Sequence, residues 1–252
     1  MSFMRVIGPE PAKSTGSYGW LRPARQIAAA ALCTCLLGLW TTTHPAPAQA
    51  AAQTLAQNQS QAAPIQIVAL GDSLTAGYGL ADKDGFVPRL QAALDAKGVK
   101  ATIANAGVSG DTASDGLARL DWSVPEGTQA VILELGANDM LRGIKPEVTR
   151  EALDKIVQRL TARHIIVMLS GMRAAPNLGP EYGAAFERIY PDLAAKYDTL
   201  LYPFFLDGVA GNLKLTQADG MHPNAAGVGV IVERILPKIL QLIDQIHTQH
   251  PS

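Results

Sequence analysis

Ser73 stands at the junction between an apolar run and a segment of small residues, in the stretch IQIVALGDSLTAGYG from Ile65 to Gly79. A serine beside glycines is commonly a turn former and nothing more. The same hydroxyl can instead act as a nucleophile, but it is a poor one at neutral pH unless a base removes its proton as it attacks. The interpretation of Ser73 therefore depends on whether the rest of the sequence supplies such a base.

His222 is the histidine best placed to be that base. The other four fall in the first fifty residues, at the C-terminal end, or on the amino side of a predicted strand: His44, His247, His250 and His164. His222 lies three residues after Asp219 in LTQADGMHPNAAG. A tight turn with Gly220 can bring the Asp219 carboxylate onto the imidazole Nδ1, which would fix the tautomer and stabilise the imidazolium. The alternative is a helix-capping turn with a surface histidine.

Two further segments could stabilise the oxyanion that forms when such a serine attacks a carbonyl. Backbone N–H groups and a neutral side-chain amide suit this role. The candidates are the N–H of Gly110 in NAGVSGD, the amide of Asn138 in GAND, and the N–H of Ser73 itself. Asparagine after a strand is often only a turn residue, so the hypothesis requires these loops to meet.

The elements around these segments predict that they do meet. Short apolar runs alternate with helical patterns, and runs that are apolar on both faces indicate a parallel sheet covered by helices. The predicted strands are 65–70, 101–106, 130–135, 165–169 and 200–205, and the predicted helices are 87–97, 113–120, 149–163, 182–196 and 224–247. Ligands of such sheets bind beyond the carboxyl ends of the strands. Ser73, Gly110 and Asn138 each follow one of the first three strands.

The first fifty residues have the pattern of an export signal. Basic residues precede an apolar run from Ile27 to Trp40, and Ala48-Gln49-Ala50 provides a small-x-small cleavage site. The run is short for a bilayer span, although a retained membrane anchor is the alternative. We expect cleavage near Ala50 and export to the periplasm or the medium. Residues 51–64 are predicted to be a disordered leader, and residues 65–252 a single domain.

Composition limits the possible partners of the exported chain. The whole chain has a formal net charge of -1, and without its first fifty residues it carries 17 basic against 21 acidic side chains. No basic stripe remains, which argues against nucleic acid and against anionic lipid headgroups. Both cysteines, Cys33 and Cys35, lie in the apolar run. The domain is therefore expected to use neither disulfides nor thiolate chemistry.

Taken in order, four blocks resemble those of the SGNH hydrolases, also called GDSL esterases and lipases. They are GDSL at 71–74, VSGDT at 108–112, GAND at 136–139 and DGMHP at 219–223. Flanking stretches such as SGDTASDGLARL and FERIYPDLA are similar to the exported thioesterase I, lysophospholipase L1 and arylesterase group. The resemblance runs from about Val68 to the final helix. The α/β-hydrolase elbow, G-x-S-x-G, is not matched, because Thr75 stands where its second glycine would be.

The resemblance implies a flavodoxin-like, three-layer α/β/α fold and a serine esterase acting on aryl esters, lysophospholipids or acyl thioesters without metal or organic cofactor. Ser73 would be the nucleophile, His222 the base and Asp219 its orienting carboxylate. The N–H groups of Ser73 and Gly110 and the side chain of Asn138 would form the oxyanion hole. Asp72 is expected to hold the nucleophile turn through backbone hydrogen bonds.

Substrate contacts are less well defined by the sequence. Ala137 stands where close relatives carry glycine, and the segment 140–146 resembles a loop that closes over the acyl chain in this group. The same segment could equally be a solvated connection. The candidate substrate-binding residues are Ala137, Met140, Met172 and Tyr182. Core packing is the alternative for Met172 and Tyr182.

Three other functions are compatible with parts of the pattern. A metal-dependent hydrolase could use Asp72, Asp219 and His222 as oxygen and nitrogen ligands. A nucleotide or flavin binder could use the glycine-rich loops, although the G-x-G-x-x-G and G-x-x-x-x-G-K signatures are missing from the sequence. A non-catalytic binding module of the same architecture is the third possibility.

Overall fold

The structure, a computed structural model, describes residues 63–249. The predicted export signal (1–50), both cysteines and all but the last two residues of the predicted leader (51–64) lie outside the described residues. Within residues 63–249, no helix combines the length and the apolar character needed to cross a bilayer.

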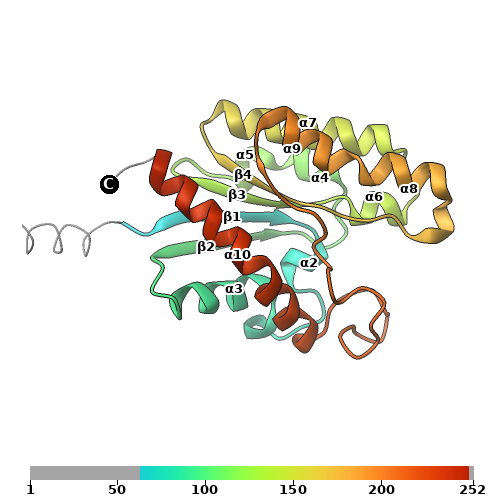
Figure 1. The fold of residues 1–252 in the computed structure, drawn as a ribbon, viewed down its shortest axis with the longest axis horizontal. Coiled ribbons are helices and arrows are strands. Elements are labelled where there is room, and N and C mark those ends of the chain that lie inside the picture. Colours follow the sequence, from blue (N-terminus) through green and yellow to red (C-terminus); the bar gives the residue numbers. More distant parts are fainter. Residues whose placement is uncertain (1–62, 250–252) are drawn as a thin grey trace, which may run out of the picture. The chain divides into compact units, whose positions relative to one another are not determined.

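Five parallel strands form one central sheet (Figure 1). The strands are β1 (Ile65–Gly71), β2 (Ala101–Gly107), β3 (Ala130–Glu134), β4 (Ile166–Ser170) and β5 (Leu200–Tyr202). Their order in the sheet is β2-β1-β3-β4-β5, which is the flavodoxin-like order with its switch point between β1 and β3. The predicted parallel sheet and its fold class are thus confirmed, and β1 to β4 begin and end within one residue of the predicted limits.

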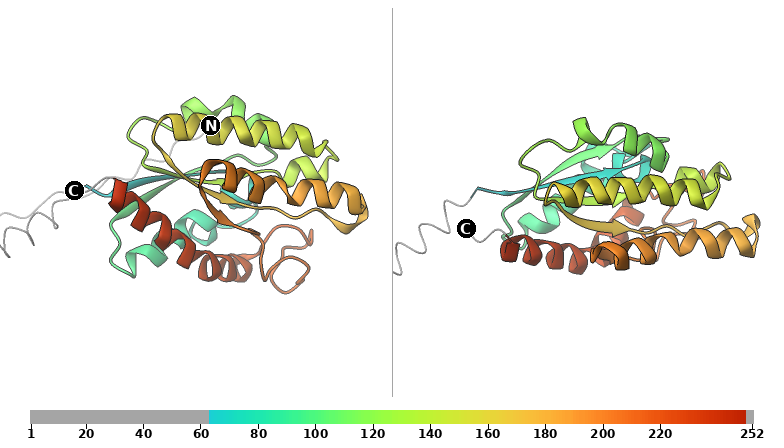
Figure 2. Two further views of the ribbon diagram at one scale, coloured as in Figure 1. Left: turned by 45° about the horizontal axis from the view of Figure 1, so that its top comes forward. Right: turned by 90° about the horizontal axis from the view of Figure 1, so that it is seen from above.

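Helices cover both faces of the sheet and give the three-layer α/β/α architecture (Figures 1 and 2). Helices α3 (Phe86–Asp95) and α10 (Ala225–Gln249) pack together on one face. The opposite face carries α4 (Ala113–Ala118), α5 (Leu120–Ser123), α7 (Pro146–Ala162), α8 (Pro180–Glu187) and α9 (Ile189–Tyr197). Short elements connect these layers: α2 (Ser73–Ala76), η1 (Asp82–Asp84), α6 (Ala137–Leu141) and η2 (Pro176–Leu178).

Helix α7 illustrates how the sequence specifies the packing. Pro146 occupies its first turn, where a missing N–H costs nothing, and Glu147 follows at the positive end of the helix dipole. Its buried side chains recur at spacings of three and four residues and face the sheet: Ala152, Leu153, Ile156, Val157 and Leu160. Burying each leucine or isoleucine contributes roughly 1.5–3 kcal/mol.

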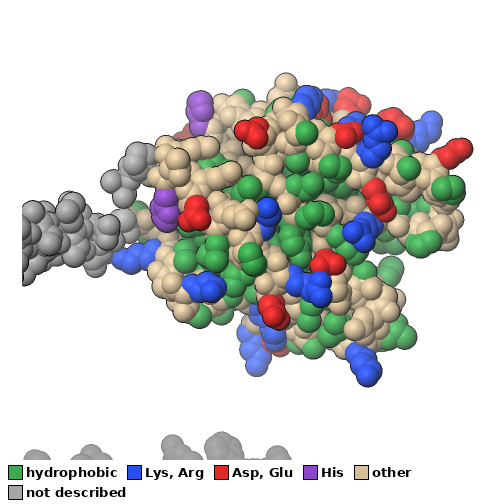
Figure 3. All heavy atoms as spheres, viewed as in Figure 1, with side chains coloured by type: hydrophobic (Ala, Val, Ile, Leu, Met, Phe, Trp, Pro, Cys, Tyr) green, Lys and Arg blue, Asp and Glu red, His purple; other side chains and the backbone are tan. Residues whose placement is uncertain are grey.

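Strand burial and surface charge follow from the layers. Every residue of β3 and β4 is buried, whereas the edge strand β2 has exposed positions. On the face viewed in Figure 3, acidic and basic side chains are interspersed over the described residues rather than gathered into a stripe of one sign.

Helix limits differ from the predictions by up to three residues: α7 begins at Pro146 rather than at residue 149, and α3 ends at Asp95 rather than at residue 97. Three other differences concern where an element is divided or stops, and two of them are caused by proline. The predicted helix 182–196 is two helices, α8 and α9, since Pro191 has no N–H to donate to the Glu187 carbonyl. Strand β5 ends at Tyr202 rather than at residue 205, because Pro203 cannot extend the hydrogen-bonded ladder. The predicted helix 113–120 ends as α4 at Ala118, and Arg119, with φ -100° and ψ 7°, separates it from α5.

Candidate active site

Ser73 is the first residue of the short helix α2, directly after β1. Asp72 is the N-cap of this helix, and its Oδ1 accepts the N–H of Leu74 at 3.0 Å. The expectation that Asp72 holds the nucleophile turn through the backbone is therefore confirmed. Sequence reasoning placed Ser73 in a loop, although an aspartate two residues before an apolar position is a usual N-cap signal.

His222 lies in the segment between β5 and α10, and backbone pairing holds this segment in place. The N–H of Gln217 donates to the His222 carbonyl at 2.7 Å, and the N–H of Asn224 donates to the Leu215 carbonyl at 2.9 Å. The Gln217 side chain also donates to the Tyr78 carbonyl at 2.7 Å, which ties the histidine segment to the loop after α2. His222 is thus positioned against the element that carries Ser73.

Asp219 turns back onto His222 across the predicted tight turn. Gly220 adopts φ +70°, a conformation that glycine reaches without strain. Asp219 Oδ1 accepts the N–H groups of Met221 and His222 at 2.9 and 3.0 Å. These two bonds and the bond to the imidazole lower the pKa of Asp219 to about 2, so the carboxylate is ionised at neutral pH.

Ser73, His222 and Asp219 form one continuous chain of hydrogen bonds. His222 Nδ1 lies 2.6 Å from Asp219 Oδ2, and His222 Nε2 lies 2.9 Å from Ser73 Oγ. An ionised carboxylate can only accept, so the neutral ring carries its proton on Nδ1 and Nε2 accepts the Ser73 hydroxyl proton. The three side chains, distant in sequence, are therefore arranged for proton removal from a serine. Their predicted convergence is confirmed.

The imidazole is partly covered by an aromatic ring. The rings of Tyr78 and His222 have centroids 4.8 Å apart at an interplanar angle of 41°. The His222 side chain keeps 19% of its surface exposed. The His222 ring is thus partly shielded by Tyr78 but remains accessible to solvent or a ligand.

Asn138 and Gly110 lie on the loops next to α2. Asn138 Nδ2 lies 3.1 Å from Asp72 Oδ2 and 3.0 Å from the Asp111 carbonyl, so it bridges the loops after β1 and β2. Gly110 directly precedes Asp111, and within residues 63–249 neither its N–H nor that of Ser73 donates to a protein acceptor. These two N–H groups are available to a ligand oxygen, whereas the Asn138 amide is shared with acceptors of the protein.

The four predicted substrate-binding residues occupy different environments. Ala137 and Met140 belong to α6 and are partly buried against the core. Met172 follows β4 and is 3% exposed within the core cluster. The Tyr182 hydroxyl donates to the carbonyl of Ile144 at 2.8 Å, which fastens the segment after α6 to α8.

A buried carboxyl pair beneath Ser73 was not anticipated from the sequence. Glu134 ends β3, is fully buried, and its Oε2 accepts the Thr75 hydroxyl at 2.7 Å. Burial, and next the neighbouring Asp72, raises the pKa of Glu134 well above its usual range. Burial also raises the pKa of Asp72 to about 6, although the bond from Leu74 opposes this. The sequence feature that could have indicated this pair is the single acid, Glu134, in the otherwise apolar run AVILEL.

A buried acid, Asp139, and a partly buried one, Asp111, brace the neighbouring loops. Asp139 is fully buried, accepts the first N–H of α4 at 2.8 Å and accepts the Thr149 hydroxyl at 2.9 Å. Asp111 pairs with Arg119, which also donates to the Gly71 carbonyl at 2.8 Å. The loops after β1, β2 and β3 are thus cross-linked below the reactive groups.

The proposed metal ligands do not form a cluster in this arrangement. Among the described residues, no group of three or more His, Cys, Asp or Glu side chains is arranged to hold a metal ion. Both Asp72 oxygens already accept hydrogen bonds, from Leu74 and Asn138. Asp219 and His222 instead bind one another.

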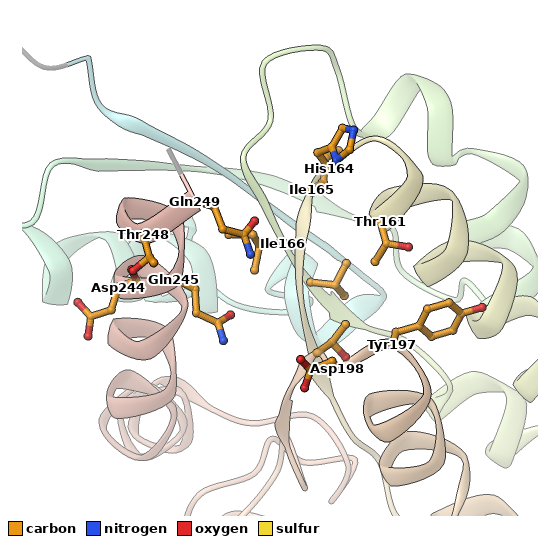
Figure 4. Close-up of a pocket in the computed structure, with 12 residues that line it drawn as sticks. Thr161, His164, Ile165, Ile166, Tyr197, Asp198, Asp244, Gln245, Thr248 and Gln249 are labelled. Atoms are coloured by element: carbon orange, nitrogen blue, oxygen red, sulfur yellow. The ribbon is translucent and has the colours of Figure 1, made fainter. Parts of the chain in front are cut away.

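A hollow of about 460 Å³ lies away from these groups (Figure 4). Its lining includes Ile165 and Ile166, at the amino end of β4, and residues from the C-terminal turns of α7, α9 and α10. Ser73 follows the carboxyl end of β1, and all strands are parallel. The hollow and the serine therefore lie at opposite edges of the sheet. His164 lines the hollow and so lies on the amino side of β4, away from Ser73, as predicted from the sequence.

Comparison with known proteins gives consistent matches. A model of the GDSL-like lipase/acylhydrolase family matches residues 69–230. Esterase TesA of Pseudomonas aeruginosa is 40% identical over 184 residues, covering 73% of this chain and 92% of that protein. Thioesterase 1/protease 1/lysophospholipase L1 of Escherichia coli is 35% identical over 184 residues, covering 73% and 87%. The crystal structure of AlinE4, described as an SGNH-hydrolase family esterase, shares 43% identity at a TM-score of 0.61, covering 72% and 97%.

Proposed function

Because the chain belongs to the GDSL-like lipase/acylhydrolase family and is a carboxylic ester hydrolase, we propose that it works by a two-step acyl transfer through Ser73, His222 and Asp219. The observation that carries this proposal is the unbroken hydrogen-bond chain from Ser73 Oγ to the Asp219 carboxylate. The relatives named above are an esterase and a thioesterase/lysophospholipase, which supports ester and thioester substrates.

In the first step, Ser73 Oγ attacks the carbonyl carbon while its proton passes to His222 Nε2. The carbonyl oxygen becomes an oxyanion. Collapse of this intermediate expels the alcohol or thiol, which takes the proton from His222, and leaves an acyl-serine. Asp219, ionised, stabilises the transient imidazolium without taking its proton.

In the second step, water attacks the carbonyl carbon of the acyl-serine by the same mechanism. His222 Nε2 removes a proton from the attacking water, and the second tetrahedral intermediate releases the acid and restores the Ser73 hydroxyl. His222 passes the Ser73 proton to the leaving group in the first step and returns a proton from water to Ser73 Oγ in the second, so the cycle needs no group other than the protein, the ester and water.

The oxyanion is proposed to bind to the N–H groups of Ser73 and Gly110 and to the Asn138 amide. The first two donors are unpaired among the described residues, which suits a preorganised hole. The Asn138 amide currently donates to Asp72 and Asp111. One of those bonds must lengthen or be shared for the amide to donate to the oxyanion.

Apolar side chains around the site favour substrates with an apolar part. Seven large apolar side chains are exposed among residues 63–249, and five of them lie in segments that follow the carboxyl ends of strands: Tyr78, Val108, Leu141, Leu213 and Met221. We propose aryl esters, acyl thioesters and lysophospholipids as the substrate classes. Ala137, Met140, Met172 and Tyr182 are proposed to set the acyl preference, with segment 140–146 closing over the chain.

Export belongs to the same proposal. A signal at residues 1–50, cleavage near Ala50 and a leader at 51–64 would deliver a single domain, 65–252, to the periplasm or the medium. The sequence pattern of the first fifty residues supports this route.

A substrate panel tests the proposal. Purified protein lacking residues 1–50 is assayed on a short nitrophenyl ester, an acyl thioester and a lysophospholipid, alongside Ser73→Ala and after chelator treatment. Turnover that survives the chelator and disappears in Ser73→Ala supports the serine mechanism. Loss of all turnover with the chelator would favour the metal-dependent alternative, and no turnover on any substrate would favour a binding module.

A further inference from the structure

Glu134 lies directly beside the start of the nucleophile turn. It pairs with Gly71 in the register between β1 and β3. Its Oε2 accepts the Thr75 hydroxyl at 2.7 Å and the Asp72 N–H at 3.4 Å, so one oxygen holds residues on both sides of Ser73. A Cβ on Gly71 would stand 2.6 Å from this oxygen. The glycine of the first block therefore makes room for a carboxyl group beneath the serine.

The surroundings of Glu134 favour a neutral acid. Within residues 63–249 no cation forms an ion pair with it, and its Oε1 is buried without a hydrogen-bond partner. The titratable neighbours are Asp72, an acid, and the buried phenol of Tyr190. Arg119, the nearby cation, is bound to Asp111 and to the Gly71 carbonyl. A carboxylate with one orphan oxygen here would be an uncompensated buried charge, whereas a neutral acid whose carbonyl oxygen is Oε2 leaves only an uncharged hydroxyl unpaired.

We propose that Glu134 is a positioning residue for acyl transfer, buried as a neutral acid that fixes the nucleophile turn from beneath. This inference rests on the proposed role of Ser73. Glu134 contacts no reacting atom. It acts through Asp72 and Thr75. Asp72 in turn accepts the N–H of Leu74 and binds the Asn138 amide.

The contacts of Glu134 explain how its loss would affect the reaction. Ser73 lies between the two residues that Glu134 Oε2 binds, and Asn138 depends on the same Asp72. Release of the turn would therefore displace the nucleophile and one oxyanion donor together. Misplacement of reacting groups by about 1 Å can cost on the order of 10²-fold in rate.

The test compares Glu134→Gln with Glu134→Ala. The glutamine carbonyl can still accept from Thr75 and Asp72, as a neutral acid does. Glu134→Gln is expected to keep kcat on a short nitrophenyl ester within about threefold, whereas Glu134→Ala should lose on the order of 10²-fold in kcat with little change in KM. The rate of fluorophosphonate labelling of folded protein should follow kcat.

A second pair of variants keeps the test decisive should Glu134→Ala fail to fold. Thr75→Val removes the hydroxyl that Glu134 holds, and Thr75→Ser retains it. We expect a loss of about tenfold in kcat for the valine and recovery for the serine. A Thr75→Val enzyme with unchanged kcat, a Glu134→Ala enzyme with unchanged kcat, or a Glu134→Gln enzyme as slow as Glu134→Ala would each overturn the proposal.

Wild type and Ser73→Ala are run in parallel. Wild type that is not labelled, or Ser73→Ala that is, would contradict the proposed function itself. The effects at Glu134 then become irrelevant, so the two failures are distinguishable.

Discussion

His222 and His164 lie at opposite edges of the same sheet, in contrasting surroundings. At the carboxyl edge, His222 is bound on both ring nitrogens, by Asp219 and Ser73, and buried acids cross-link the loops below it. At the amino edge, His164 lines a hollow of about 460 Å³, and among the described residues its side chain and that of Asp198 form no hydrogen bond or ion pair. Size therefore does not mark this hollow as a reactive site, because neither of these two titratable side chains is paired within residues 63–249. The hydrogen-bonded side chains that could catalyse a reaction lie at the carboxyl edge, where separate loops bring them together.

The largest effect expected is loss of turnover when the chain of hydrogen bonds through Ser73, His222 and Asp219 is broken. Ser73→Ala and His222→Ala should each lower kcat by about 10⁴-fold or more, because neither residue can act without the other. His164→Ala is the matched control and should leave kcat within twofold. Steady-state kinetics on a nitrophenyl ester measures all three. A comparable loss in His164→Ala would break the contrast between the two edges.

Asn138→Ala tests the oxyanion donor at the carboxyl edge. Loss of one donor should lower kcat by about 10² to 10³-fold, or about 3 kcal/mol in the activation free energy. The side chain also bridges Asp72 and Asp111, so the free energy of unfolding should fall by roughly 1–2 kcal/mol. Unfolding by urea and kcat of the folded fraction separate the two effects. A variant that unfolds readily but keeps the wild-type kcat would make Asn138 purely structural.

The pH dependence of stability tests the buried acid at the carboxyl edge. The pKa of Glu134 is raised by burial, so between its unfolded and folded values the folded protein binds one proton more than the unfolded chain. Wild-type stability should therefore fall as pH rises from 5 to 8, by at most ~1.4 kcal/mol per pH unit from this group. Glu134→Gln removes this loss, so its stability relative to wild type should increase with pH.

The control for that measurement is the exposed Glu126, whose change to Gln should give no such trend. Urea unfolding at pH 5, 6.5 and 8 provides the free energies. If the free energy of unfolding of wild type instead rose relative to that of Glu134→Gln as pH increased, Glu134 would be ionised in the folded protein.

The smallest effect is expected at the amino edge. Asp198 ends α9 with φ +50°, a position where glycine is usual. Asp198→Gly should leave kcat unchanged and change the free energy of unfolding by no more than about 1 kcal/mol, in the stabilising direction. Thermal unfolding and ester turnover measure both. A marked drop in turnover would mean that the amino edge is coupled to the site.

Much of the fold was predictable because the strands are apolar on both faces and short. Predictions of β1 to β4 were accurate to one residue, and errors arose where Pro191 and Pro203 interrupted apolar patterns. The one-turn helix α2 was missed, since so few residues define no period. Its caps, Asp72 at the start and Gly77 in a left-handed conformation at the end, were the local signals.

The proposed reactive groups were predictable from the sequence, whereas the groups that support them were not. Ser73, His222 and Asp219 emerged because few histidines are available and one has an acid three residues before it. Glu134 and Asp139 were not predicted, because their roles depend on neighbours that are distant in sequence. A single acid in an apolar strand does not reveal that it lies under a serine until the register of β1 and β3 is known.

Covalent labelling of Ser73 tests the central claim most directly. Purified protein is treated with a fluorophosphonate, digested, and the modified residue is located by tandem mass spectrometry. The hydrogen-bond chain predicts one adduct, on Ser73, formed at a rate that falls sharply in His222→Ala and is unchanged in His164→Ala. An adduct on another residue, or an active enzyme that is never labelled, would contradict the account.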